Sequence, residues 1–240
     1  MENLPSVNLG PWDLEKIPLV VVDAGHGGHD GGAVAGGTLE KKLALALALR
    51  LRDELITLGL RVKMTRDSDV FLPLEERAAL ADEWQADAFI SVHLNTSASP
   101  EVHGIETYYN ERKSLAAQRA LQVKWSLAKG PVQDLRGRRL AESLQRHACR
   151  GTEAVDRGIK QRNYAVVSQT QVPAALIECG FLTHEAEAAS LKNPDYQKKL
   201  TLAIARGMAE FLKIQGRYPP HGVLLDSQEP TEETPETAAP

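Results

Sequence analysis

Short β-branched segments alternate with longer segments rich in Ala and Leu, and this alternation constrains the fold more than any other feature of the chain. Residues 18–23 (PLVVVD), 60–65 (LRVKMT) and 87–93 (DAFISVH) have the composition of buried strands. Between them, residues 38–58 and 73–84 are rich in helix-forming residues and too long for strands. Strand–helix–strand–helix–strand order in one sheet implies parallel pairing with right-handed crossovers. We therefore expect an α/β fold, a three-layer sandwich with a mostly parallel twisted sheet covered by helices on both faces.

The second half of the chain continues this pattern. Three further segments have strand composition, the first of them near an edge of the sheet: residues 104–110, 164–168 and 174–178. Four have helix composition: residues 114–127, 138–147, 185–191 and 194–214. We expect residues 179–181 to turn the chain after the last strand, and Thr38 to cap the first long helix.

The composition indicates one main globular domain. Hydrophobic residues make up 42% of the 240 residues and charged residues 25%, which is ordinary for a soluble protein. Residues 1–17 are polar and contain prolines, and we expect an N-terminal arm there. Residues 216–240 are rich in Pro and Glu and poor in apolar residues, so we expect a disordered acidic tail. The domain proper is then residues 18–215.

Charge and cysteine content exclude several classes of protein. The net charge is −4, from 28 basic and 32 acidic residues, and without a basic cluster the chain has no electrostatic signature of nucleic-acid binding. The longest apolar run is residues 43–49, whereas a membrane span needs about 20 residues, so we expect none. No export signal is visible at the N-terminus. Two cysteines, Cys149 and Cys179, cannot form a disulfide framework.

Four ionisable residues are predicted to meet at one edge of the sheet, because ligands of open parallel sheets bind beyond the carboxyl ends of the strands. His26 follows the first strand in DAGHGGHDGG, and His93 ends the third in SVHLN. Glu178 ends a late strand in ALIECGF, and Glu40 begins the first long helix at the same edge. Two imidazoles and a carboxylate are a typical ligand set for catalytic zinc, and a second carboxylate is then the expected general base.

Each of these residues also has an ordinary structural interpretation. His26 is compatible with a loop histidine bonded to a backbone carbonyl, and His93 with a buried core histidine. Glu40 is an acidic residue of the kind favoured in a first helical turn. Glu178 is harder to explain in this way, since an acid after an apolar strand is costly to bury unless it is paired. It is the convergence of the four that favours a functional site.

Six motifs in order resemble the zinc-dependent N-acetylmuramoyl-L-alanine amidases of the Amidase_3 family, which are cell-wall hydrolases. They are VVDAGHGGHDGGA, MTRDSDVFLPLEERAALAD, ISVHLNTS, HGIETYYN, RGIKQRNYAVV and VPAALIECGFLTHEAE. The resemblance extends over most of residues 18–214. Departures from the family pattern affect no proposed ligand; they are Gly31, Asp82, Leu94 and Cys179.

The resemblance implies a role for each of the four residues. His26, Glu40 and His93 are expected to hold Zn²⁺, and Glu178 is expected to act as the catalytic general base that activates zinc-bound water. The reaction implied is cleavage of the amide between N-acetylmuramic acid and L-alanine of peptidoglycan, in the periplasm or cell wall. Two alternatives stay open: a related zinc amidohydrolase with another amide substrate, and a non-catalytic peptidoglycan-binding domain.

Residues 111–137 form a segment that looks longer than in minimal members of the family. Some relatives that act in cell separation carry an inserted regulatory helix near this place, which covers the active site until a partner protein displaces it. The segment ERKSLAAQRALQVKWSLAKG has the composition of such a helix. A helix that simply packs on the domain explains the same composition, and the sequence does not separate the two.

Overall fold

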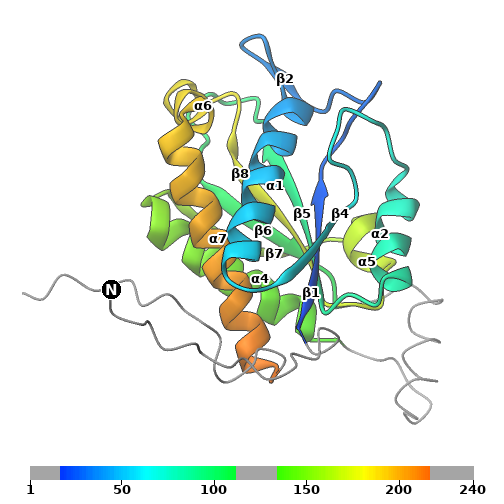
Figure 1. Ribbon diagram of the computed structural model, residues 1–240. Coiled ribbons are helices and arrows are strands. Elements are labelled where there is room, and N and C mark those ends of the chain that lie inside the picture. The colour runs from blue at the N-terminus through cyan, green and yellow to red at the C-terminus, as the bar shows by residue number, and fades with distance from the viewer. Residues whose placement is uncertain (1–16, 112–133, 217–240) are drawn as a thin grey trace, which may run out of the picture.

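Six strands form one sheet in a computed structural model that describes residues 17–111 and 134–216 (Figure 1). The order is β4-β1-β5-β8-β6-β7. All neighbouring strands are parallel except β6 and β8, which are antiparallel. The strands are β1 Leu19–Ala24, β4 Arg61–Met64, β5 Ala88–Asn95, β6 Ile105–Tyr109, β7 Asp156–Gln161 and β8 Ala174–Phe181.

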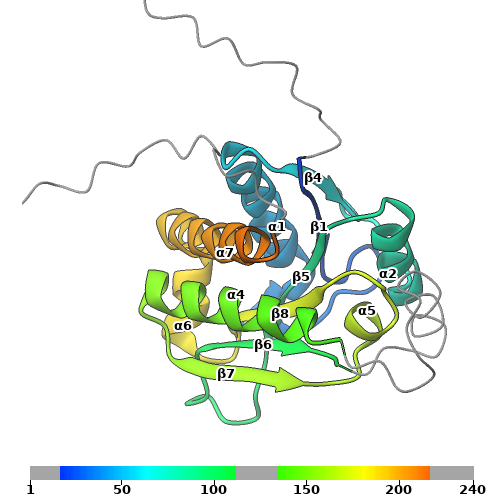
Figure 2. The same ribbon diagram turned by 90° about the horizontal axis from the view of Figure 1, so that it is seen from below.

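Helices cover both faces of this sheet, and the layers are separated in Figure 2. One face carries α1 (Glu40–Thr57), α4 (Arg136–Thr152) and α7 (Pro194–Ile214). The other carries the shorter α2 (Leu74–Glu83) and α5 (Ala165–Ser168). The predicted three-layer α/β architecture with a mostly parallel sheet is confirmed. Two small additions are α6 (Glu185–Lys192) and a hairpin of β2 (Val34–Ala35) and β3 (Thr38–Leu39).

Each face of the sheet buries its own hydrophobic cluster. All six residues of β1 are buried: Val20 and Val22 pack into the larger cluster beneath α1, α4 and α7, and Val21 packs into the smaller one on the opposite face. This explains the apolar run LVVV at residues 19–22 of β1, because a central parallel strand is covered on both sides. Within the described residues, no helix is both long and apolar enough to cross a bilayer.

The expected strand at residues 164–168 is wrong, because the structure has the one-turn helix α5 there. Val166 and Val167 are buried in the smaller cluster, so their apolar side chains fill a core position without adding a strand. The strand of this region is instead β7, whose sequence DRGIKQ is polar and largely half-exposed. It lies at the edge of the sheet and has only β6 as a neighbouring strand, so an apolar sequence pattern is not required.

The expected turn at residues 179–181 is also wrong, because β8 continues to Phe181 and pairs there with Asn95. The register shifts between His93 and Asn95, and Gly180 has a φ of 145°. A β-carbon on Gly180 would lie 2.8 Å from the carboxyl carbon of Glu187. Glycine therefore permits an irregularity in β8 immediately after Glu178, as is common beside active sites.

The expected cap of the first long helix is wrong as well. Helix α1 begins at Glu40, its N-cap is Leu39, and no side chain caps it. Thr38 instead pairs with Ala35 in the β2–β3 hairpin. The expected helices at residues 138–147, 185–191 and 194–214 correspond to α4, α6 and α7, whereas the expected helix at residues 114–127 lies outside the described residues. So do almost all of the expected arm and tail.

Candidate metal centre

His26 lies in the glycine-rich loop after β1, in a strained backbone conformation. Its φ is 59°, which is uncommon for a residue other than glycine and is typical of functional sites. The ring is held by Asp30, whose Oδ2 lies 2.8 Å from His26 Nδ1. A β-carbon on Gly25 would lie 2.4 Å from the ring of His93, so only glycine allows the loop to pass so close to that ring.

Two arginines fix the backbone of this loop. Arg66 donates from Nε to the carbonyl of Ala24 at 2.8 Å and from Nη2 to that of Gly25 at 2.7 Å. Arg77 donates from Nη2 to the carbonyl of His26 at 2.7 Å. Its Nη1 also forms an ion pair with Asp23 at 2.8 Å, and both side chains are almost completely buried. Removing one partner of such a pair is strongly destabilising, because it leaves a buried charge uncompensated.

Glu40 is the first residue of α1 and is buried at the centre of the site. Its Oε1 accepts a hydrogen bond from the backbone amide of Leu94 at 3.0 Å and lies 2.9 Å from His93 Nδ1. Its Oε2 accepts one from the amide of Ala33 at 2.8 Å and lies 3.1 Å from His26 Nε2. The carboxylate is therefore oriented by the protein backbone and does not simply complement the helix dipole.

These contacts change the proton affinities of the site. Burial acts to lower the pKa of His26, but the hydrogen bonds and charges of Glu40 and Asp30 outweigh it and raise that pKa to about 8. Burial acts to raise the pKa of Glu40, but the hydrogen bonds from His26 and His93 hold it well below its ordinary value. Glu40 is therefore an anion at neutral pH, as a metal ligand must be.

His26, Glu40 and His93 fit a single divalent ion. Each offers one ligand atom, and these atoms lie within 4.8 Å of one another. Zinc ligands lie about 2.0–2.2 Å from the metal, so two ligand atoms of one ion are at most about 4.4 Å apart, and the limit of 4.8 Å is close to this span. Within the described part of the chain this is the one such group found. A β-carbon on Gly32 would lie 2.6 Å from both Glu40 and His26, so glycine keeps the space beside the ligands open.

Glu178 lies beside this group on the neighbouring strand. It is in register with His93, so the two side chains project from the same face of the sheet. Its Oε2 is buried and has no hydrogen-bond partner among the described residues. Burial and the charges of Glu40 and Glu106 raise the pKa of Glu178 to about 7, against the opposing effect of His93 and His26. A carboxyl with that pKa can both accept and donate a proton at neutral pH.

The structure thus brings together all four residues that the sequence analysis placed at one edge of the sheet: His26, Glu40, His93 and Glu178. The sequence reasoning missed Asp30, Asp23, Arg66 and Arg77, which hold the loop and its histidine. Asp23 carried a usable signal, because a charged residue at the end of the apolar strand PLVVVD needs a buried partner. Cys179 is fully buried, and this burial raises the pKa of its thiol.

The family follows from the sequence match. Residues 20–210 match the model of Amidase_3, described as N-acetylmuramoyl-L-alanine amidase. The chain belongs to the Amidase_3 family. Its enzyme class is therefore that of the N-acetylmuramoyl-L-alanine amidases, which are amide hydrolases of cell-wall peptidoglycan.

Individual members of the family resemble this amidase over most of its length. The germination-specific N-acetylmuramoyl-L-alanine amidase of Bacillus subtilis (strain 168) is 31% identical over 225 residues, which cover 87% of this chain and 86% of that protein. The catalytic domain of the amidase CwlV from Bacillus (Paenibacillus) polymyxa var. colistinus has a TM-score of 0.68 and 33% identity, covering 82% of this chain and 99% of that one. The CwlD amidase of Clostridioides difficile, solved in complex with the GerS lipoprotein, has a TM-score of 0.70 and 27% identity, covering 82% and 99%.

Proposed function

We propose that this amidase is a zinc enzyme that cleaves the amide between N-acetylmuramic acid and L-alanine of peptidoglycan. His26, Glu40 and His93 hold the zinc, and Glu178 is the general base. The observation that carries the proposal is a ligand triad of matching size beside a buried carboxyl that has no hydrogen-bond partner among the described residues. Family membership supplies the bond that is cleaved.

The three ligands are prepared for the metal by the rest of the chain. Asp30 holds Nδ1 of His26, so Nε2 of that ring faces Glu40. Backbone amides hold both oxygens of Glu40, which limits the reorganisation needed when a cation binds. Such supporting hydrogen bonds orient ligands and raise metal affinity. A bound zinc ion supplies Lewis acidity next to the amide carbonyl and lowers the pKa of water from about 15.7 to about 7.

Glu178 moves the proton. Its carboxylate takes a proton from the attacking water as the water oxygen bonds to the lactyl carbonyl carbon. The same proton then passes to the alanine nitrogen as the carbon–nitrogen bond breaks, which leaves a carboxylic acid on the sugar and a free amine on the peptide. One group can perform both transfers because its pKa lies near neutrality.

The place of action and the activator protein are the remaining parts of the proposal. Because peptidoglycan lies outside the cytoplasmic membrane, we propose the periplasm or cell wall as the place of action. An activator protein that displaces a helix in residues 111–137 stays a prediction. Of that segment the structure describes Glu111, the two residues before α4, and the first two residues of α4.

Zinc content and product analysis test the proposal together. The purified protein is expected to contain about one zinc per chain and to release free stem peptides from muropeptides, identified by mass spectrometry. Glu178→Gln should retain zinc but lose activity by roughly 10²–10⁴-fold, the usual contribution of a general base. His93→Ala should lose both zinc and activity.

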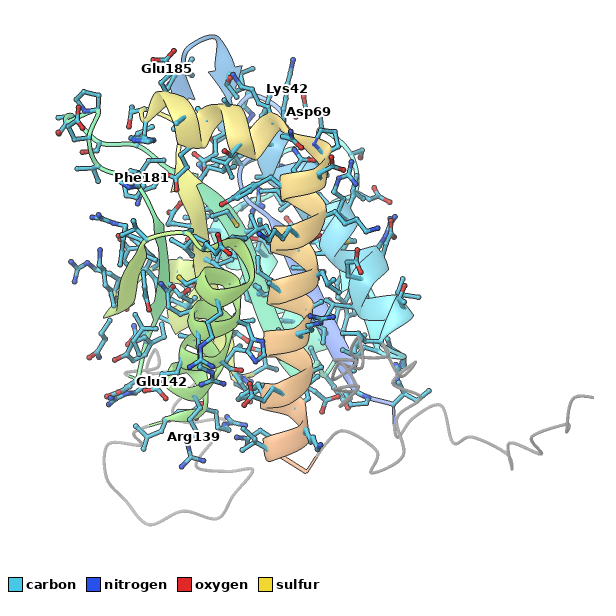
Figure 3. All side chains as sticks on the ribbon, turned by 90° about the vertical axis from the view of Figure 1, so that its left-hand side faces the viewer. Lys42, Asp69, Arg139, Glu142, Phe181 and Glu185 are labelled. Atoms are coloured by element: carbon cyan, nitrogen blue, oxygen red, sulfur yellow. The ribbon has the colours of Figure 1, made fainter. Side chains whose placement is uncertain are left out.

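Glu142→Gln is the matched control, because Glu142 is an exposed residue on α4, at the end of the molecule away from Glu185 and Asp69 (Figure 3). It should change neither zinc content nor activity. A protein that binds muropeptides without zinc and without cleavage would instead be the non-catalytic domain. A zinc protein that cleaves other amides and leaves muropeptides intact would be the related amidohydrolase.

A further inference from the structure

A band of polar side chains crosses the sheet from the metal centre to its edge. His93 on β5 is in register with Glu178 on β8, and Glu178 is in register with Glu106 on β6. Residues directly opposite on neighbouring strands have β-carbons about 5 Å apart on the same face. Next to β6, the edge strand β7 carries Arg157 and Lys160, whose side chains both reach the Glu106 carboxylate.

Glu106 anchors this end of the band. Its side chain is 3% exposed, and its Oε2 pairs with Arg157 Nε at 2.9 Å and with Lys160 Nζ. Its Oε1 accepts hydrogen bonds from Asn95 Nδ2 at 2.9 Å and from the hydroxyl of Tyr108. Burial alone would raise the pKa of Glu106, but its hydrogen-bond donors lower it, so the group is ionised at neutral pH. Arg157 and Lys160 carry two positive charges against the one negative charge of Glu106, so this group of three side chains has a net positive charge.

Both cations are held in place, yet they stay accessible. The side chains of Arg157 and Lys160 are 30% and 31% exposed. The Arg157 guanidinium lies 4.9 Å from the centre of the Phe181 ring, and Lys160 Nζ lies 5.9 Å from that of Tyr108. Contacts of this kind restrict long side chains, so less conformational entropy is lost when they bind an anion.

The opposite side of the metal centre has a different character. Phe71 is 42% exposed, and its ring contacts that of His29 at 4.1 Å. Gly28 brings the His26 loop against Phe71, since a β-carbon there would lie 2.8 Å from its backbone nitrogen. The site therefore lies between an aromatic surface and a cationic one.

The substrate has the same asymmetry. In the uncut polymer the N-acetylated sugars are uncharged around the lactyl amide, whereas the stem peptide carries free carboxylates. Two strand spacings, about 10 Å, separate β8 from β7, and an extended peptide advances about 3.3 Å per residue. A carboxylate two or three residues beyond the scissile amide is therefore within reach of β7.

We propose that Arg157 and Lys160, positioned by Glu106, form a subsite for a free carboxylate of the stem peptide. The peptide then lies over β6 and β7, and the sugar lies towards Phe71. This inference rests on the proposed function. It predicts that the amidase prefers peptidoglycan whose acidic stem residue after alanine is not amidated.

The test uses two muramyl tripeptides that differ only in whether the α-carboxyl of the glutamate after alanine is free or amidated. The full-length zinc-loaded protein should show a KM roughly tenfold lower for the free acid, with a similar kcat, as expected for one charge-assisted contact. Lys160→Met should raise the KM of the free acid to that of the amide and leave the amide unchanged. Lys160→Arg keeps the charge and should keep the preference.

Arg139→Gln is the control, since Arg139 is an exposed residue on α4, at the end of the molecule away from Phe181 (Figure 3). It should alter neither KM. A thermal melt of each variant separates lost binding from lost folding, because Lys160→Met leaves Glu106 with one partner fewer. Equal KM values for both substrates in the wild type, or an equal rise for both in Lys160→Met, would overturn the subsite and leave the proposed function standing. Cleavage of neither substrate would overturn the proposed function itself.

Discussion

Glu178 is expected to help the reaction and to weaken the fold. Its carboxyl has an ordinary pKa of 4.5, which burial raises to about 7 in the folded chain. Between these pH values the folded state holds a proton that the unfolded state has released. The folded state therefore has its full stability below about pH 4.5. It loses the stability contributed by the protonated Glu178 as the pH rises through about 7 and the buried carboxyl ionises.

Glu178→Gln should for this reason stabilise the zinc-free protein at alkaline pH. The free energy of unfolding in urea, with a chelator present, should exceed that of the wild type at about pH 8 by on the order of 3 kcal/mol, and should match it at about pH 4. The exposed Glu142→Gln serves as the control and should follow the wild type at both values. Parallel curves for Glu178→Gln and the wild type across this range would show that Glu178 is not buried as described.

At the scale of the element, the two helix starts of α1 and α7 differ in a way that the sequence alone misjudges. Asn193 caps α7, and its side chain accepts hydrogen bonds from the backbone amides of Asp195 and Tyr196. Thr38 has the right chemistry for a cap but lies one residue too early, in the hairpin that precedes α1. A cap depends on backbone position as well as residue type.

Asn193→Ala should therefore lower the free energy of unfolding by about 1 kcal/mol, the usual value of a side-chain cap. Thr38→Ala should lower it by less than about 0.5 kcal/mol, as expected for a surface substitution. Urea denaturation of both variants next to the wild type measures the difference. If Thr38→Ala were the more damaging of the two, the start of α1 at Glu40 would be wrong.

The elements that sequence reasoning misassigned share one physical cause. Periodicity reports which side chains are apolar, and Val166 and Val167 are apolar because they fill the smaller core, whatever their backbone conformation. Strand β7 has no such signal, because it is an edge strand of polar residues that belongs to the sheet through its pairing with β6. Elements with many buried side chains, such as β1 and α7, were predictable because their buried positions are mostly apolar in the sequence.

At the scale of the whole molecule, the described residues contain both hydrophobic clusters. The larger one is bounded by β1 at one end of the chain and by α7 at the other, where Met208, Phe211 and Leu212 are buried. We therefore expect residues 17–216 to be sufficient for the fold, in agreement with a domain at residues 18–215.

A protein trimmed to residues 17–216 should keep its melting temperature within about 2 °C of the full chain and should bind zinc equally well. Trimming further, to residues 17–207, removes Met208, Phe211 and Leu212 of α7, each worth about 2–5 kcal/mol, and should abolish cooperative unfolding. Calorimetry of the three proteins tests this prediction. A large loss of stability in the 17–216 protein would mean that the terminal segments contribute to the core.

The sequence by itself determined the fold class and placed four ionisable residues at one edge of the sheet, whereas the order of the strands came from the structure. The sequence could do so because buried strands are recognisable as apolar segments with polar residues at their ends. Parallel strands also bring their carboxyl ends to one edge of the sheet. Only the tertiary structure decided that Asp30 holds His26, that Arg66 and Arg77 fix the loop, and that Glu106 gathers two cations from the edge strand. Those contacts join polar segments that have no hydrophobic periodicity. The contacts form only when the folded sheet brings the segments together.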